Sequence, residues 1–143
     1  RIPAGNVHPM PVDIVPPDLA AAAYEGELRA ALGHPLGEIP RFDLILLGMG
    51  PDGHTASLFP GSPARAETVR LVAAVPPPTT AQPAVARLTF TLPLLNAAHQ
   101  VLFLATATGK EAALARALAP EPDPAVPASL VRPRGELAWF VVE

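Results

Sequence analysis

The strongest constraint on the fold comes from two short segments, residues 42–47 and 101–107, that are apolar on both faces of an extended chain. Strands of this composition are typical of parallel sheets that carry helices on both sides. Helical patterns lie between the two segments, so they predict an α/β protein with a mostly parallel sheet covered on both faces. In such sheets ligands bind at the carboxyl ends of the strands. The loops that follow Leu47 and Ala107 are therefore the first candidates for a site.

Local signals predict the remaining elements. A helix is expected from Pro17 to Leu32, because Pro17 and Asp18 suit a first turn and Gly33 suits the position after a helix end. Apolar and alternating patterns predict strands at 69–75, 87–92 and 137–142, and a helix at 108–118. The prolines cluster at 9–17, 76–83 and 120–133, which indicates stiff loops between ordered elements.

The composition limits the classes of function. The 143 residues fit one domain, residues 1–143, and a hydrophobic fraction of 50% is enough for a core. The formal net charge is −3 and there is no basic block, which argues against a nucleic-acid partner. No apolar run approaches the ~20 residues that cross a bilayer, so no membrane partner is expected. Because the chain has no cysteine, thiol catalysis and thiolate metal sites are excluded.

The loop after Leu47 reads Gly48-Met49-Gly50-Pro51-Asp52-Gly53, which has the G-x-G-x-x-G spacing of dinucleotide-binding turns. That function requires a long helix after the third glycine and an acidic residue ~20 positions later, at the end of a second strand. Here the following segment predicts only a short helix broken at Pro60, and Glu67 precedes the next strand. The sequence therefore argues against a bound dinucleotide.

His54 offers a different function for the same turn. Glycines let the backbone turn sharply and bring N–H groups close to a ligand. A histidine at the tip of the turn stands at the mouth of the sheet, and imidazole exchanges protons near neutral pH. Asp52 is close enough along the chain to orient it. The structural alternative is that His54 only caps the short helix that follows.

Lys110 follows the second apolar strand. Thr108 and Glu111 have the spacing of a capping box with Thr108 as the N-cap, which puts Lys110 in the first turn of a helix. The free N–H groups there and the ammonium group together favour an anion at the end of a strand. A solvated lysine without a ligand is the alternative.

Four segments resemble the 6-phosphogluconolactonase family. Phe42 to Pro60, FDLILLGMGPDGHTASLFP, resembles its signature G-x-G-x-D-G-H-T-A-S-L-F-P nearly residue for residue. Residues 87–98, RLTFTLPLLNAA, resemble its R-x-T-x-T-x-P-x-x-N-x-A segment. Gly109-Lys110 resembles a helix start of the family, and residues 131–139 resemble its closing segment. The resemblance extends over almost the whole chain from about Pro3.

The resemblance implies a three-layer, Rossmann-like α/β/α sandwich, the fold of glucosamine-6-phosphate deaminases and ribose-5-phosphate isomerases. It implies a cytoplasmic enzyme that hydrolyses 6-phospho-D-glucono-1,5-lactone to 6-phosphogluconate in the oxidative pentose phosphate pathway, without a metal or a cofactor. In this interpretation His54 is the general base that activates water for attack on C1, and Asp52 assists it. A small sugar-phosphate lactone is then the partner.

Further residues are expected to contact that substrate. The family pattern makes Lys110 a phosphate contact and Arg87 a second contact for phosphate or carboxylate. The alternative for Arg87 is an exposed polar strand face shared with two threonines. From the turn itself we infer that backbone N–H groups around Gly50 and Gly53 contact the substrate and stabilise its tetrahedral oxyanion.

The sequence departs from the family pattern in two places. The family carries an amino-terminal third with a Gly-Gly-Ser/Thr-x-Pro phosphate loop and an Asp-Glu-Arg segment, and neither is found here. The chain is therefore expected to be the carboxyl-terminal two-thirds of a lactonase, with the amino-terminal part missing. Val142 stands where the family often has Asp.

Two other functions stay open at this point. Glucosamine-6-phosphate deaminases share the D-G-H turn but continue I-A-F-N-E-P, and this chain lacks the acidic partner that their histidine uses. A non-catalytic sugar-phosphate-binding domain of the same fold would have no need of His54. The sequence does not give the oligomeric state.

Overall fold

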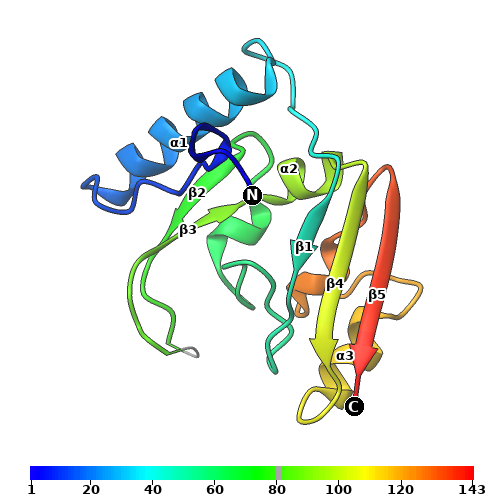
Figure 1. Ribbon diagram of the computed structural model, residues 1–143. Coiled ribbons are helices and arrows are strands. Elements are labelled where there is room, and N and C mark those ends of the chain that lie inside the picture. Colours follow the sequence, from blue (N-terminus) through cyan, green and yellow to red (C-terminus); the bar gives the residue numbers. More distant parts are fainter. Residues whose placement is uncertain (80–81) are drawn as a thin grey trace.

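A parallel sheet with strand order β1-β4-β5 forms one half of the molecule (Figure 1). The computed structural model describes residues 1–79 and 82–143, so residues 80 and 81 of the 76–83 proline cluster lie outside the described residues. The strands are β1 (Ile45–Leu47), β4 (Gln100–Thr106) and β5 (Glu136–Val142). The register places Ile45 beside Val101, and Val101 beside Leu137. The α/β class with a mostly parallel sheet is confirmed.

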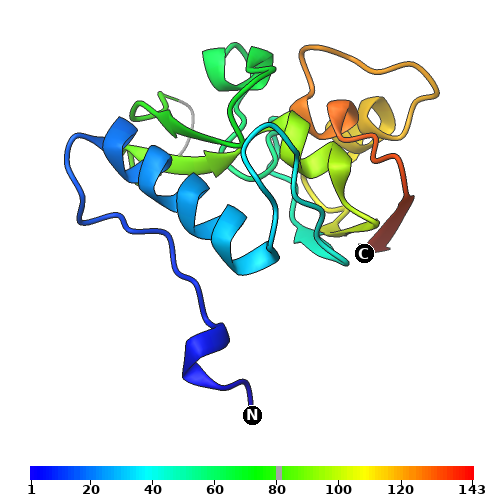
Figure 2. The same ribbon diagram turned by 90° about the horizontal axis from the view of Figure 1, so that it is seen from above.

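One face of this sheet is buried under α3 (Glu111–Ala117) and the 3₁₀ turn η3 (Pro127–Leu130), which lie together on that side when the molecule is seen from above (Figure 2). Phe103 of β4 and Trp139 of β5 are paired in the register and stack on this face, with ring centroids 3.9 Å apart and planes 3° from parallel. The principal core packs around them. It includes Leu47, Met49, Leu58, Phe59, Leu95, Val101, Leu114 and Val126.

The other face of the sheet is open. Leu46 is 58% exposed, Leu104 50% and Phe140 63%, and the register places these side chains of β1, β4 and β5 on the same side. The sequence predicted burial on both faces, and within the described residues this prediction is wrong. The two-residue period of a strand sends alternate side chains to a side on which no described helix packs.

A helix and a hairpin form the second half of the molecule. Helix α1 (Pro17–Leu32) packs on the antiparallel strands β2 (Val72–Val75) and β3 (Arg87–Phe90). Its bounds are those predicted, and Gly33 ends it with φ 69° in the left-handed region. The second core cluster consists of Ala21, Tyr24, Leu28, Leu71, Val72 and Leu94. Phe42 and Phe90 pack against both clusters, so the two halves share a continuous interior.

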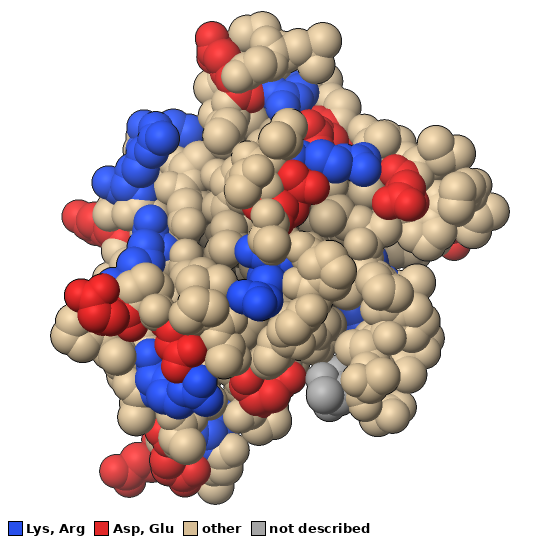
Figure 3. Space-filling view, turned by 180° about the vertical axis from the view of Figure 1, so that it is seen from behind, with Lys and Arg blue, Asp and Glu red and all other residues tan. Residues whose placement is uncertain are grey.

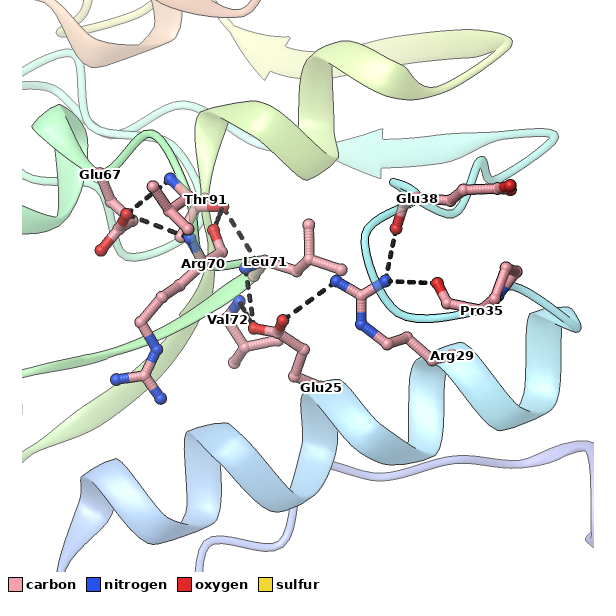
Figure 4. A network of polar contacts seen from close by, with 10 residues as sticks. Glu25, Arg29, Pro35, Glu38, Glu67, Arg70, Leu71, Val72 and Thr91 are labelled. Atoms are coloured by element: carbon pink, nitrogen blue, oxygen red, sulfur yellow. Dashed lines mark hydrogen bonds and ion pairs between the residues drawn. The ribbon is translucent and has the colours of Figure 1, made fainter.

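Glu25 fixes α1 to the hairpin through the backbone (Figure 4). Its Oε2 accepts hydrogen bonds from the N–H groups of Leu71 at 2.9 Å and Val72 at 3.4 Å, while Oε1 pairs with Arg29. The hydroxyl of Thr91 donates to the Arg70 carbonyl at 2.5 Å, just before the strand. These bonds satisfy buried backbone groups at the start of β2.

Three local predictions are wrong. The short helix expected after Gly53 is a turn closed by a bridge between Thr55 and Leu58, so His54 caps no helix. Residues 92–97 form a helix, α2 (Leu92–Ala97), where the expected strand ran on to Leu92. Proline in its first turn suits a helix start.

The third error concerns α3. Lys110, not Thr108, is its N-cap, because Gly109 adopts φ 74° and turns the chain before the helix begins. The Glu111 carboxylate accepts a hydrogen bond from the Gly109 N–H at 3.2 Å, so the predicted capping box does not form. The remaining short turns are η1 (Ala4–Asn6) and η2 (Pro63–Ala66). Among the described residues, no helix has the length and hydrophobicity needed to cross a membrane.

Candidate functional site

The turn Gly48–His54 starts where β1 ends and is closed by its own hydrogen bonds. The Gly50 N–H donates to the His54 carbonyl at 2.9 Å, and the Gly53 N–H donates to the Gly50 carbonyl at 3.0 Å. The Thr55 hydroxyl donates to the Gly48 carbonyl at 2.8 Å. Because the Gly50 and Gly53 N–H groups are donors inside the turn, the structure does not support the expectation that they face an oxyanion.

The two glycines have a different role, which is to make space. A Cβ atom on Gly50 would overlap the imidazole of His54, so the ring lies directly against that Cα. Gly53 has φ 80°, and a Cβ there would lie 2.7 Å from Cγ1 of Val126. Its carbonyl accepts a hydrogen bond from the Ala128 N–H at 3.0 Å. The turn is thus held against η3 on one side and against its own histidine on the other.

His54 and Asp52 form a hydrogen-bonded pair. Nδ1 of His54 lies 2.5 Å from Oδ1 of Asp52, and the same oxygen accepts the His54 backbone N–H at 3.1 Å. A carboxylate at Nδ1 selects the tautomer that carries its proton there. Nε2 of the neutral ring is then the nitrogen that can take up a proton. Both side chains are about one quarter exposed, so water and a ligand can reach them.

Phe59 connects this pair to Arg87. Its ring centroid lies 4.6 Å from that of His54, and the Arg87 guanidinium lies over the Phe59 ring, with Cζ 5.8 Å from the centroid. The turn is also tied to the strand of Arg87, because the Ser57 N–H donates to the Thr89 hydroxyl at 3.1 Å. Thr89 and Thr91 are buried, so the alternative of an exposed polar strand face is wrong.

Arg87 has hydrogen-bonding capacity left. Nη2 donates to the Pro83 carbonyl at 2.9 Å. Nε is buried and makes no hydrogen bond within the described part of the chain. A buried donor without an acceptor is costly, and an anion or a water molecule would satisfy it.

Lys110 reaches the same turn from the end of β4. Its ammonium group donates to the Met49 carbonyl at 2.7 Å, which brings a positive charge to the backbone between Gly48 and Gly50. A cavity of about 490 Å³ opens at this point, and Leu46, Leu47, Gly48, Met49, Gly50, His54 and Ala56 line it. The structure therefore brings His54, Asp52 and Lys110 together on one turn, with Arg87 joined to them through Phe59.

The sequence did not single out Phe59 or the Met49 carbonyl. Phe59 occurs in an apolar run and was assigned no role, although it follows His54 closely and is the aromatic residue of that run. A hydrogen bond to a backbone carbonyl cannot be inferred from residue types, because every residue has that group. Within the described residues no group of three His, Asp or Glu side chains is placed to hold a metal ion.

The fold and the turn define an α/β protein with a histidine–aspartate pair and cationic side chains at the carboxyl edge of a parallel sheet. The family described as glucosamine-6-phosphate isomerases/6-phosphogluconolactonase matches residues 1–139. A 6-phosphogluconolactonase of Synechocystis sp. is 46% identical over 141 residues, which cover 98% of this chain and 57% of the relative. The human 6-phosphogluconolactonase is 45% identical over 135 residues, covering 90% of this chain and 49% of the relative.

Solved structures agree with these relatives. The 6-phosphogluconolactonase of Trypanosoma cruzi superposes with a TM-score of 0.86 at 34% identity, over 98% of this chain and 58% of that one. A monomeric glucosamine-6-phosphate deaminase superposes with a TM-score of 0.59 at 21% identity, which shows the fold alone. The chain belongs to the glucosamine-6-phosphate isomerase/6-phosphogluconolactonase family. It spans 57% of the length of the Synechocystis relative, and the expectation that it is the carboxyl-terminal two-thirds of a lactonase stays a prediction.

Proposed function

We propose that the protein hydrolyses 6-phospho-D-glucono-1,5-lactone to 6-phosphogluconate, the lactonase step of the oxidative pentose phosphate pathway. The observation that carries this proposal is the bond between Nδ1 of His54 and Asp52, which leaves Nε2 as a base at the edge of the sheet. The 46% and 45% identity to 6-phosphogluconolactonases supports the choice of substrate.

The reaction needs one proton acceptor that later becomes a donor. Nε2 of His54 takes a proton from water as the water oxygen attacks the lactone carbonyl carbon C1. When the tetrahedral intermediate collapses, the bond between C1 and the ring oxygen breaks, and the imidazolium returns the proton to that oxygen. Asp52 stabilises the imidazolium through the Nδ1–H bond, as the aspartate of a catalytic triad does.

The cations of the site bind the charged end of the substrate. Lys110 lies on the turn and Arg87 has a buried Nε without an acceptor among the described residues, so both are suited to phosphate. The Gly50 and Gly53 N–H groups are used within the turn, so we assign Lys110 to the phosphate and not to the oxyanion. No step requires a metal or a cofactor.

The test replaces His54 by Gln, which keeps a polar side chain and cannot take up the proton. We expect kcat for 6-phosphogluconolactone, after subtraction of spontaneous hydrolysis, to fall by ~10²–10⁴ with little change in KM.

Three outcomes would contradict the proposal. The first is a His54→Gln protein with an unchanged kcat. The second is release of ammonia from glucosamine 6-phosphate by the unsubstituted protein at a higher rate than lactone hydrolysis. The third is sugar-phosphate binding without turnover of either substrate, which would identify a non-catalytic domain.

A further inference from the structure

A second cavity, of about 700 Å³, lies at the opposite end of the parallel sheet from His54. Three of its lining residues, Arg41, Ala97 and Arg134, occur shortly before β1, β4 and β5 along the chain. The His54 turn, in contrast, follows β1. Because all three strands run in the same direction, this cavity is at their amino ends and is separate from the site described above.

The lining of this cavity carries an excess of positive charge. It contains two more guanidinium groups than carboxylates: the arginines are Arg41, Arg65, Arg132 and Arg134, and the carboxylates are Glu38 and Glu67. None of the four arginines takes part in the ion pairs formed by the described residues. Such an excess gives the cavity a positive potential on a chain of formal net charge −3, and this potential favours an anionic ligand.

The two carboxylates are engaged elsewhere. Oε1 of Glu67 accepts the backbone N–H groups of Thr68, Val69 and Arg70 at 2.8, 2.7 and 3.1 Å. Glu38 faces His34, with 3.4 Å between Oε2 and Nδ1. Neither carboxylate forms an ion pair with an arginine of the cavity among the described residues, so the guanidinium groups keep their charge available.

Backbone carbonyls hold most of these guanidinium groups in place. Arg132 donates from Nε, Nη1 and Nη2 to the carbonyls of Ser129, Pro120 and Ala119 at 3.1, 2.8 and 2.9 Å. Arg41 Nε donates to the Ala97 carbonyl at 2.8 Å, and Arg65 Nη1 donates to the Pro124 carbonyl at 2.9 Å. Side chains fixed in this way lose little entropy when a ligand binds.

Arg65 supplies an independent sign of a missing acceptor. Its Nε is buried and has no hydrogen-bond partner within the described residues. Leaving such a donor unsatisfied costs free energy, which a bound oxyanion or a water molecule would recover.

Hydrogen bonds fix the backbone at two of the lining residues, Glu38 and Glu67 (Figure 4). Arg29 of α1 donates from Nη1 to the carbonyls of Pro35 and Glu38, which fixes the loop before β1. Glu67 accepts three backbone N–H groups and so fixes the segment that leads to β2. On the rear of the molecule, basic side chains are interspersed with acidic ones and do not merge into one stripe (Figure 3). This arrangement suits a small ligand better than a nucleic acid.

We propose that this cavity, defined by Arg41, Arg65, Arg132 and Arg134, binds a small multivalent oxyanion. Guanidinium groups match the paired oxygens of phosphate and carboxylate, and the excess of two positive charges favours a ligand with at least two negative charges. The cavity volume lies within the range of small-molecule sites.

The experiment is a titration of the purified protein with pyrophosphate at constant ionic strength, followed through the ¹⁵N–¹H signals of the arginine Nε–H groups. The protein carries Lys110→Ala, so that anion binding at the His54 turn is weakened. We expect saturable shifts of the Arg65 and Arg132 signals. Arg65→Ala should raise the Kd for pyrophosphate by about tenfold or more, the loss of one charge-assisted hydrogen bond.

Matched variants separate the site from general charge effects. Arg134→Ala removes an exposed side chain and should also raise the Kd, which keeps the test valid if Arg65→Ala fails to fold. Arg70→Ala removes the same charge from a residue that does not line the cavity, and it should leave the Kd within about twofold because a charge without direct contact to the ligand is screened by salt. A second titration with citrate distinguishes the ligand's source: binding of pyrophosphate alone assigns the cavity to phosphorylated molecules, and binding of both assigns it to multivalent anions in general.

Three results would overturn the proposal. The first is a response that stays linear without saturation. The second is a set of shifts confined to the His54 turn. The third is an equal rise in Kd for Arg70→Ala and for the two cavity variants.

Discussion

The absence of a side chain at Gly50 determines where the imidazole of His54 can lie. The imidazole of His54 lies against the Gly50 Cα, so a methyl group there would displace the ring. We expect Gly50→Ala to lower kcat by about 10², because small misplacements of reacting groups are costly. The free energy of unfolding, measured with urea, should change much less. The control is Gly26→Ala, which meets no atom within 4 Å and should leave kcat unchanged. Equal kcat values for the two variants would show that the His54 imidazole can move aside without lowering activity.

Lys110 has both a structural and a proposed binding function. Its ammonium group donates to the Met49 carbonyl, and the proposed function adds the substrate phosphate. Lys110→Ala should therefore raise KM for 6-phosphogluconolactone by about tenfold or more, since a hydrogen bond to a charged group is worth ~1.5–3 kcal/mol. KM for unphosphorylated gluconolactone should change little. A similar rise for both substrates would show that Lys110 acts only through the turn.

At the scale of the secondary-structure elements, Gly135 governs how β5 joins the sheet. A Cβ on Gly135 would overlap the carbonyl group of His99, and the same carbonyl accepts the Glu136 N–H at 2.8 Å. The obstacle is backbone, which cannot rotate away. We expect Gly135→Ala to lower the free energy of unfolding by ~1–3 kcal/mol, the usual cost of overpacking. Urea denaturation would measure it, with Gly26→Ala in α1 as a control that should be stabilising by ~0.5–1 kcal/mol. Equal unfolding midpoints would contradict the expected clash.

Elements with local signals could be predicted from the sequence. Pro17 and Gly33 mark the ends of α1 within their own neighbourhood, and both ends are confirmed. The apolar run before Thr106 likewise gave β4 nearly to the residue. The turn bearing His54 could be located because its glycines and histidine are adjacent along the chain.

Errors arose where distant residues decide the conformation. The segment after His54 is a turn and not a helix, because the Ser57 N–H bonds to Thr89, which is remote in sequence. The N-cap of α3 is a local exception: Gly109 has a positive φ and turns the chain before the helix, so Lys110 and not Thr108 is the N-cap. The contact of His54 with Phe59 and Arg87 depends on the same tertiary packing, so no local pattern could have shown it.

For the whole molecule, surface carboxylates link stability to pH. The pKa of Glu67 is lowered by the Val69 and Arg70 N–H groups, that of Glu111 by its own and the Gly109 N–H, and that of Asp123 by the Ala125 N–H and then by Arg116. The ordinary pKa is 4.5 for Glu67 and Glu111 and 3.8 for Asp123. The folded state therefore binds fewer protons than the unfolded state in this range, and stability that is complete above these values is lost as the pH falls below them.

We expect the urea midpoint to be constant near neutral pH and to decrease below a pH of about 4.5, the ordinary pKa of Glu67 and Glu111. A Glu67→Gln, Asp123→Asn double variant should be less stable near neutrality and show a flatter acid limb, because two of the lowered groups no longer titrate. An acid limb of unchanged slope in the double variant would show that these carboxylates do not govern it.

The stacking of Trp139 on Phe103 gives the molecule an intrinsic optical probe. Trp139 is the one tryptophan of the chain, so selective excitation of indole fluorescence reports on a single place, the junction of β4 and β5. Separation of β5 from β4 would expose the indole to water and shift its emission to longer wavelength. The hairpin and α1 carry no tryptophan, and their loosening would leave the emission unaltered. Comparison of this emission with far-ultraviolet circular dichroism during unfolding would therefore reveal whether the two halves melt together or one after the other.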